Sequence, residues 1–258
     1  RCLTDIAQEP LFSQQTYLKT VNLPKSMEIT EGSEEVIVAV LDSGVDRNHP
    51  ELEGRLLPGI DFVNGDSDPS DDNGHGTHVA GILAANIDGT GIAGVTQNVK
   101  ILPVKVADEN GLLYHSDIIK GIDYAIKQGA DIINMSFSGS LENEYEKIII
   151  EEGYKRGITL IAAAGNDGLN KLTYPSSYPN VISVAATSHT ASGFSPARFS
   201  NYNEMVDIAA PGTKIITTGL NGKYVKGEGT SFSAPIISGL AALIKSVNPT
   251  WKPAMIQW

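Results

Sequence analysis

The sequence predicts an α/β fold in which helices cover both faces of a mostly parallel, twisted sheet. Short runs of apolar, β-branched residues alternate along the chain with segments whose apolar residues recur at helical spacing. The apolar runs lack the strict alternation of half-exposed strands, which is typical of parallel strands buried on both faces. A length of 258 residues and a hydrophobic content of 41% fit one domain with a large core.

The predicted elements follow one another in this alternating order. Residues 1–34 are mixed and polar, and we expect an arm on the surface of the domain. Asn221-Gly222 predicts a two-residue hairpin turn, and the segment from Pro253 predicts a helix that is cut off after one turn. Strands are predicted at residues 35–41, 99–106, 131–135, 158–164, 181–184 and 206–209, and helices at 75–85, 116–128, 142–155 and 231–247.

Charge and composition exclude several classes of function. A formal net charge of −11 argues against a nucleic-acid partner, because phosphate binding depends on clustered Lys and Arg. No apolar run approaches the length of a membrane span, so none is predicted. The single cysteine, Cys2, cannot form an internal disulfide. The chain begins with Arg1 rather than Met, from which we expect a processed product that has lost its targeting segment.

Three glycine-rich segments place an acid, an imidazole and a hydroxyl where an α/β sheet places chemistry. Asp42 ends the first predicted strand, His75 begins a helix, and Ser231 stands at a helix N-terminus. Serine attacks only after a base takes its proton, and the base needs a carboxylate to orient it. Asn166 follows another buried strand and could donate a hydrogen bond to an oxyanion. These four residues predict a serine hydrolase.

Other motifs point elsewhere and are rejected on their context. Residues 89–94 match G-x-G-x-x-G, but a predicted helix precedes them and a strand follows, the reverse of a dinucleotide site. The chain contains neither a G-x-S-x-G nucleophile elbow nor an H-E-x-x-H zinc motif. His78 lies one helical turn after His75, and we expect a hydrogen-bonded core histidine there rather than a metal ligand.

These motifs together resemble the subtilisin-like serine proteases (subtilases), most closely the thermitase-type members. The similarity runs from about Pro10 to the last residue, and so implies one peptidase domain over residues 1–258 with the subtilisin-like fold. It also implies a monomer, peptide or protein substrates, an N-terminal prodomain in the precursor and an extracellular location, with an intracellular one left open. The matching segments are Asp42-Ser43-Gly44, His75-Gly76-Thr77-His78-Val79-Ala80-Gly81, Ala164-Gly165-Asn166 and Gly229-Thr230-Ser231.

An acidic loop at residues 61–70 offers several hard oxygen ligands for Ca²⁺, although a solvated acidic loop would have the same composition. The resemblance implies a thermitase-type calcium site in this loop and a second site where the N-terminal arm meets the loop after the His75 helix. A third, weaker cation site would lie near Ser176, Tyr178, Val181 and Asp207, which gives one to three structural ions. The expected ligands are Asp61, Asn64, Asp66, Asp68 and Ser70 for the first site, and Glu9, Glu51, Asn86, Asp88, Thr90 and Ile92 for the second.

The resemblance further implies that an extended peptide binds as an added strand. Ser138 stands where the family usually has Gly, and Thr173 is expected at the base of the primary pocket, where Gly is common. A broad preference for large apolar residues is therefore not expected. The residue after the nucleophile is Phe232 instead of the usual Met, which predicts resistance to peroxide. The expected substrate-binding residues are Leu112, Ser136, Phe137, Ser138, Ala163, Ala164, Gly165 and Thr173.

Alternatives to a general endopeptidase stay open at this point. One is a processing protease of the same fold that cuts a leader or proprotein at a single site. Another is a non-enzymatic binding module on the same scaffold, which would not react with a serine-directed reagent at Ser231. A metallohydrolase that uses His75 and His78 is a remote third.

Overall fold

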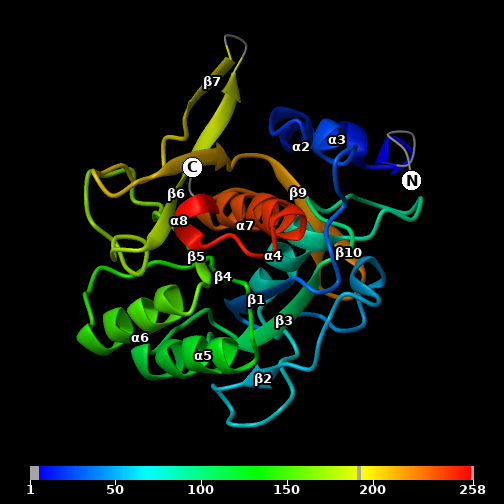
Figure 1. Ribbon diagram of the computed structural model, residues 1–258. Coiled ribbons are helices and arrows are strands. Elements are labelled where there is room, and N and C mark those ends of the chain that lie inside the picture. Colours follow the sequence, from blue (N-terminus) through cyan, green and yellow to red (C-terminus); the bar gives the residue numbers. More distant parts are fainter. Residues whose placement is uncertain (1–5, 191–192, 257–258) are drawn as a thin grey trace.

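The computed structural model describes residues 6–190 and 193–256. At its centre lies an eight-stranded sheet with the order β2-β3-β1-β4-β5-β6-β7, in which β8 also pairs with β6 (Figure 1). All of these pairings are parallel except that of β6 with β7, so the predicted mostly parallel sheet is confirmed. The strands are β1 (Ile37–Asp42), β2 (Ile60–Asp61), β3 (Lys100–Lys105), β4 (Ile132–Met135), β5 (Thr159–Ala163), β6 (Val181–Thr190), β7 (Gly193–Pro196) and β8 (Ile208–Pro211).

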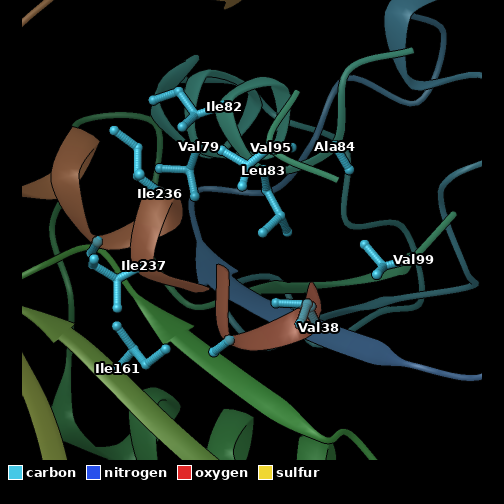
Figure 2. Close-up of a cluster of buried hydrophobic side chains, with 14 of the residues drawn as sticks. Val38, Val79, Ile82, Leu83, Ala84, Val95, Val99, Ile161, Ile236 and Ile237 are labelled. Atoms are coloured by element: carbon cyan, nitrogen blue, oxygen red, sulfur yellow. The ribbon is translucent and has the colours of Figure 1, made fainter. Parts of the chain in front are cut away.

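Helices cover the sheet on both sides. On one face lie α4 (His75–Ala84) and α7 (Thr230–Val247), and on the other lie α5 (His115–Lys127) and α6 (Glu144–Lys155) (Figure 1). The first pair encloses the larger apolar core, in which Ile237 of α7 lies close to Ile161 of the sheet and Ile236 lies beside Val79 of α4 (Figure 2). The second pair encloses a separate core over β1, β3, β4 and β5. The three-layer arrangement follows from strands that are apolar on both faces.

A small hairpin lies outside the main sheet. Strands β9 (Ile215–Gly219) and β10 (Lys223–Gly227) pair antiparallel, and β9 packs beside α4. Asn221 and Gly222 in the connecting turn have φ angles of 60° and 68°. Such left-handed angles favour Asn and Gly, and the predicted hairpin is present. Gly219 pairs with Lys223, however, so the loop contains residues 220–222 and not the two residues that we expected.

The N-terminal segment departs from the expected surface arm. It forms η1 (Phe12–Gln14), α2 (Thr16–Thr20) and α3 (Leu23–Ser26). Tyr17, Leu18 and Leu23 are buried in the larger core, so this segment packs as part of the domain. Because this segment is polar on average, its composition did not indicate that Tyr17, Leu18 and Leu23 would be buried. Cys2, whose pairing the sequence addressed, lies outside the described residues.

Two further features concern the C-terminal part of the chain. The helix expected from Pro253 is the short α8 (Pro253–Ile256), and residues 257–258 lie outside the described part. Helix α7 is long and apolar enough to match a membrane span by length and composition, contrary to the expectation that no run approached that length. However, 67% of this 18-residue helix is buried inside the domain, where it forms the centre of the larger core.

Candidate active site

Strand β1 and helix α4 bring Asp42 and His75 together. Asp42 is the last residue of β1, and its carboxylate oxygen Oδ1 lies 2.8 Å from Nδ1 of His75, the first residue of α4. Oδ1 also accepts a hydrogen bond of 2.8 Å from the backbone N–H of Ser43. Asp42 is only 4% exposed and so is shielded from water, whereas the His75 side chain is 32% exposed. With Nδ1 facing the carboxylate, the other ring nitrogen, Nε2, is left as the group that can accept a proton.

Competing effects set the pKa of His75. Burial lowers the pKa of this imidazole, whereas the charge of Asp42, its hydrogen bond and the charge of Asp71 raise it, and the net pKa lies above the ordinary value. The imidazolium form is therefore stabilised where it forms. This property suits a base that must hold a proton during part of a reaction.

Ser231 lies in the first turn of α7, where backbone N–H groups have no partner within the helix. Gly229, the N-cap residue, has a φ of 148°, and a Cβ there would lie 3.0 Å from Oγ of Ser231 and 3.5 Å from Nδ2 of Asn166. Glycine at this position thus lets the hydroxyl and the amide approach the same point. Within residues 6–190 and 193–256 no hydrogen bond joins His75 to Ser231. Such contacts often tighten only when substrate binds.

The side chain of Asn166 is oriented by Thr230. Oδ1 of Asn166 accepts hydrogen bonds from the backbone N–H of Thr230 at 2.8 Å and from its hydroxyl at 2.9 Å. The hydroxyl oxygen of Thr230 in turn accepts from the N–H of Gly165 at 3.1 Å. Since Oδ1 is held in this way, Nδ2 points away from Thr230 and remains available as a donor. Together with the N–H of Ser231 it can stabilise negative charge on an oxygen.

A cavity of about 270 Å³ joins these groups. Of the predicted substrate-binding residues, Ser136, Phe137, Ser138 and Ala163 line it. The full lining is Asp42, Ser43, Asn73, His75, Ala107, Gly111, Leu113, Ser136, Phe137, Ser138, Ala163, Asn166, Thr230 and Ser231.

The other predicted substrate-binding residues lie beside this cavity. Leu112 is 51% exposed, and its neighbour Leu113 lines the cavity. Ala164 and Gly165 follow Ala163 without being part of the lining. Thr173 is buried behind Ala164, to whose carbonyl oxygen its hydroxyl donates at 2.7 Å. Thr173, which we expected at the pocket base, is therefore bonded to Ala164, the residue after Ala163 of the lining, and does not line the cavity itself.

Phe232 packs between the two histidines of α4. Its ring stacks on His78 with a centroid distance of 6.0 Å and meets His75 edge to face at 6.2 Å. Within the described residues the ring of His78 makes no hydrogen bond, so it is an aromatic packing partner and not the hydrogen-bonded histidine that we expected. Burial and the neighbouring His75 lower the pKa of His78, which keeps it neutral.

Two positioning features were not predicted from the sequence. Asp71 accepts hydrogen bonds from the hydroxyls of Ser43 and Thr77 and from the backbone N–H groups of Gly74 and Thr77, which fixes the start of α4. Lys105, buried at the end of β3, donates to the carbonyl oxygen of Ser43 at 2.8 Å and to Asp72 at 2.6 Å. The signal in the sequence was an Asp-Asp pair before His75 and a lone Lys that ends an apolar strand.

Among the residues predicted to bind cations, Glu9 and Glu51 stand out. Both are buried, and one carboxylate oxygen of each, Oε2, has no hydrogen-bond partner. Burial raises the pKa of Glu51 to about 7, although Tyr224 and the N–H of Ile92 donate to its other oxygen. Burial also raises the pKa of Glu9, and the charge of Asp88 adds to this effect. Two buried carboxylates, each with one oxygen that has no partner, fit a cation that supplies the missing contacts.

The remaining predicted ligands are already engaged with the protein. Asp61 accepts from the N–H groups of Val63 and Asn64 and from the amide of Asn64. Ser70 donates to Asp68, whose N–H donates to Asp66, so the loop at residues 61–70 is closed by its own hydrogen bonds. Oδ1 of Asn86 accepts from Arg55, and the hydroxyl of Thr90 donates to Asp88.

Two observations bear on these cation sites as a whole. At the third expected site, Asp207 accepts from the N–H of Ser183. No group of three or more His, Cys, Asp or Glu side chains arranged for a metal occurs in the described part of the chain. The calcium ligands therefore stay predictions.

Comparison with known proteins agrees with this geometry. Residues 33–258 match the sequence profile of the subtilase family. A thermophilic serine proteinase of Bacillus sp. (strain AK1) is 42% identical over 220 residues, which are 85% of this chain and 54% of the relative. Thermitase of Thermoactinomyces vulgaris is 40% identical over 240 residues, which are 92% of this chain and 85% of thermitase. The major intracellular serine protease of Bacillus subtilis (strain 168) is 41% identical over 239 residues, 89% of this chain and 74% of the relative.

The chain thus spans about half the length of the first of these relatives and most of the second. The family profile covers residues 33–258, which include the sheet and the cavity described above but not the N-terminal helices. This chain therefore belongs to the subtilase family.

Proposed function

We propose that the protein hydrolyses peptide bonds through an acyl-enzyme, with Ser231 as nucleophile, His75 as general base and Asp42 as the residue that orients His75. The observation that carries this proposal is the 2.8 Å contact between Asp42 and His75 in the same cavity as Ser231. Asn166 and the N–H of Ser231 would stabilise the oxyanion, because Nδ2 of Asn166 lies near the same point beside Gly229 as Oγ of Ser231, and the N–H of Ser231 belongs to the first turn of α7.

The proton transfers follow from the position of each group. Nε2 of His75 takes the proton of the Ser231 hydroxyl as the oxygen attacks the peptide carbonyl, and the imidazolium is stabilised by Asp42. The same proton then passes to the leaving amine, which leaves an ester on Ser231. Water, deprotonated by His75, hydrolyses that ester and restores the hydroxyl. The raised pKa of His75 supports the first step, because it makes the imidazole a better proton acceptor.

We propose peptide or protein substrates that bind in an extended conformation between two segments. Leu113, which forms an isolated antiparallel bridge with Ala107, lies on one side of the cavity, and Ser136, Phe137 and Ser138 lie on another. A second candidate is a processing protease that cuts one site in a leader or proprotein. The hydroxyl of Ser138 favours it, since this oxygen lies 3.2 Å from the position of a Cβ on Gly165 and narrows that side of the cavity.

A fluorophosphonate reagent tests the proposal. The wild-type protein should be labelled at Ser231, as located by peptide mass spectrometry, and should cleave a denatured protein, whereas Ser231→Ala should do neither. Ser246→Ala, on the same helix but outside the cavity lining, is the matched control and should behave as the wild type. A protein that folds but is neither labelled nor active would indicate a binding module. A peptide-library cleavage profile then separates broad from single-site specificity.

We also propose a structural Ca²⁺ between the N-terminal segment and the loop after α4, held by Glu9, Glu51 and atoms of residues 86–92. The unpartnered buried oxygens of Glu9 and Glu51 support it. The ion would supply positive charge and cross-link the two segments, and so would stabilise the folded state by mass action. A chelator should lower the melting temperature of the wild type but leave that of Glu9→Gln/Glu51→Gln nearly unchanged. The loop at residues 61–70, named above as the first expected site, stays a prediction.

The remaining proposals depend on the family alone. They are a single monomeric peptidase domain over residues 1–258, synthesis with an N-terminal prodomain, and an extracellular location. The relative from Bacillus subtilis is named an intracellular protease, so location within the family differs. Size-exclusion chromatography with light scattering tests the monomer, and fractionation of the producing cells tests the location.

A further inference from the structure

Behind the cavity wall, three buried polar side chains form a continuous row. The hydroxyl of Ser238 in α7 donates to Oδ1 of Asn134 in β4 at 2.8 Å, and Nδ2 of Asn134 donates to Oγ of Ser136 at 2.8 Å. Ser238 and Asn134 are 0% exposed and Ser136 is 3% exposed. Within an apolar core such a row is costly unless each member is satisfied. Ser136, at the end of the row nearest the active site, lines the cavity that contains Ser231.

The arrangement of α7 on β4 explains why this row ends beside the nucleophile. Asn134 lies in β4 and Ser136 follows the last residue of this strand, and their side chains meet because residues two apart in an extended segment point to the same side. Ser231 and Ser238 are seven residues apart and so share one face of α7, about two turns from each other. Strand β4 runs toward the cavity and α7 runs away from it. Asn134 and Ser238 therefore meet inside the core, while Ser136 and Ser231 are both at the cavity.

The hydrogen-bond directions leave one donor free at the cavity. The amide of Asn134 has an oxygen that only accepts and a nitrogen that only donates. Since Ser238 donates to the oxygen, the nitrogen faces Ser136, and Oγ of Ser136 acts as acceptor. The hydroxyl hydrogen of Ser136 is then not used by Asn134. In the part of the chain that the structure describes, it is donated to no other protein atom.

We propose that the Ser136 hydroxyl donates this hydrogen bond to a carbonyl oxygen of the bound peptide, and that Ser238 is a positioning residue that keeps it available. An extended peptide offers carbonyl oxygens as its strongest acceptors, and Ser136 belongs to the wall along which the peptide is proposed to lie. Without the Ser238 hydroxyl, the Asn134 amide is free to turn its oxygen toward Ser136, whose hydroxyl would then donate inward. This inference rests on the proposed endopeptidase function.

The test compares kcat/KM of Ser136→Ala, Ser238→Ala and the double variant on a peptide substrate. Active enzyme is counted by fluorophosphonate labelling, so that loss of folded protein does not enter the rate. Each single variant should lose roughly tenfold in kcat/KM, the scale of one hydrogen bond. The double variant should lose no more than Ser136→Ala alone, because Ser238 acts only through the Ser136 hydroxyl. Ser246→Ala is the matched control: its hydroxyl donates to the carbonyl of Ala242 in the same helix, and kcat/KM should not change.

Two results would overturn the inference: an unchanged kcat/KM in Ser136→Ala, or losses that multiply in the double variant, as a purely structural role of Ser238 predicts. If Ser238→Ala fails to fold, Ser238→Cys keeps the size of the side chain with a much weaker donor. That variant should show the same loss, and full activity in it would refute the role of Ser238. A wild type that is neither labelled nor active overturns the proposed function itself, whereas a labelled, active wild type with a fully active Ser136→Ala overturns only this inference.

Discussion

Asn166→Ala is the substitution for which the structure gives the most definite expectation. The change removes the Nδ2 donor beside Ser231, and it also leaves the N–H and the hydroxyl of Thr230 without their acceptor. Loss of one oxyanion donor lowers kcat by roughly 10²–10³-fold, or about 2.7–4 kcal/mol, a value measured in subtilisin and carried over here to a relative. KM should hardly change, because the negative oxygen exists only after attack.

The same structure gives the cost in stability. Two partly buried hydrogen bonds are lost, from Thr230, which is buried, to Asn166, which is exposed; at about 1 kcal/mol net for each, the free energy of unfolding should fall by at most about 2 kcal/mol. In a domain of this size that corresponds to roughly 4–8 °C in melting temperature. The rate should therefore be measured at a temperature well below the unfolding transition, where the variant is folded and the loss in kcat reflects catalysis alone.

Variants of Thr230 separate orientation of the amide from its presence. Thr230→Val removes the hydroxyl that fixes Asn166 and should lower kcat about tenfold, the scale of one neutral hydrogen bond. Thr230→Ser keeps the hydroxyl and should retain nearly full kcat. The assay is steady-state hydrolysis of an amide substrate with kcat and KM determined separately. If Asn166→Ala raised KM and left kcat within about threefold of the wild type, the oxyanion reasoning would be refuted.

Further predictions concern two acidic residues, Asp71 and Glu146, and the oxidation of residue 232. Asp71→Asn should move the acid limb of the kcat/KM profile to lower pH, because the Asp71 charge helps to raise the pKa of His75; an unmoved limb contradicts this. Burial raises the pKa of Glu146, and the contact with His115 only partly offsets this effect. The folded state therefore binds the proton of Glu146 more tightly than the unfolded chain does. As a result, the free energy of unfolding falls as the pH rises from the ordinary pKa of Glu through the raised one. Glu146→Gln should therefore stabilise the protein at pH 7 relative to its effect at pH 4 in urea unfolding, and equal effects at both would count against it. Phe232→Met should inactivate faster in peroxide than the wild type, since a sulfoxide would lie beside His75, and equal half-lives would show that the residue is irrelevant.

The strands and the principal site residues could be predicted because they depend on local signals. Asp42, His75 and Ser231 each stand at the junction of an apolar run or helix with a glycine-rich segment, and such junctions lie at one edge of a parallel sheet. The runs of β-branched residues that became β1, β3, β4 and β5 are buried on both faces and therefore have a strong pattern. Short exposed strands such as β7 have no such pattern.

What the sequence could not provide depends on contacts between distant segments. Thr230 orients Asn166 across a separation of 64 residues, and Ser238 reaches Asn134 across 104. No local pattern marks these partners. The predicted substrate-binding residue Leu112 shows a related limit: it is 51% exposed while its neighbour Leu113 lines the cavity, since side chains of an extended segment alternate in direction.

Helix α7 both presents Ser231 and forms the middle of the larger core. Its side chains touch β4, β5, β6 and α4, so the nucleophile cannot shift without disturbing the packing of half the domain. The same helix thus carries the reactive serine and holds the larger core together. The structure gives no basis for a partly unfolded form that is still active. On heating, the enzyme should lose activity and structure in one cooperative transition, because unfolding of α7 disrupts the larger core and displaces the Ser231 hydroxyl at the same time.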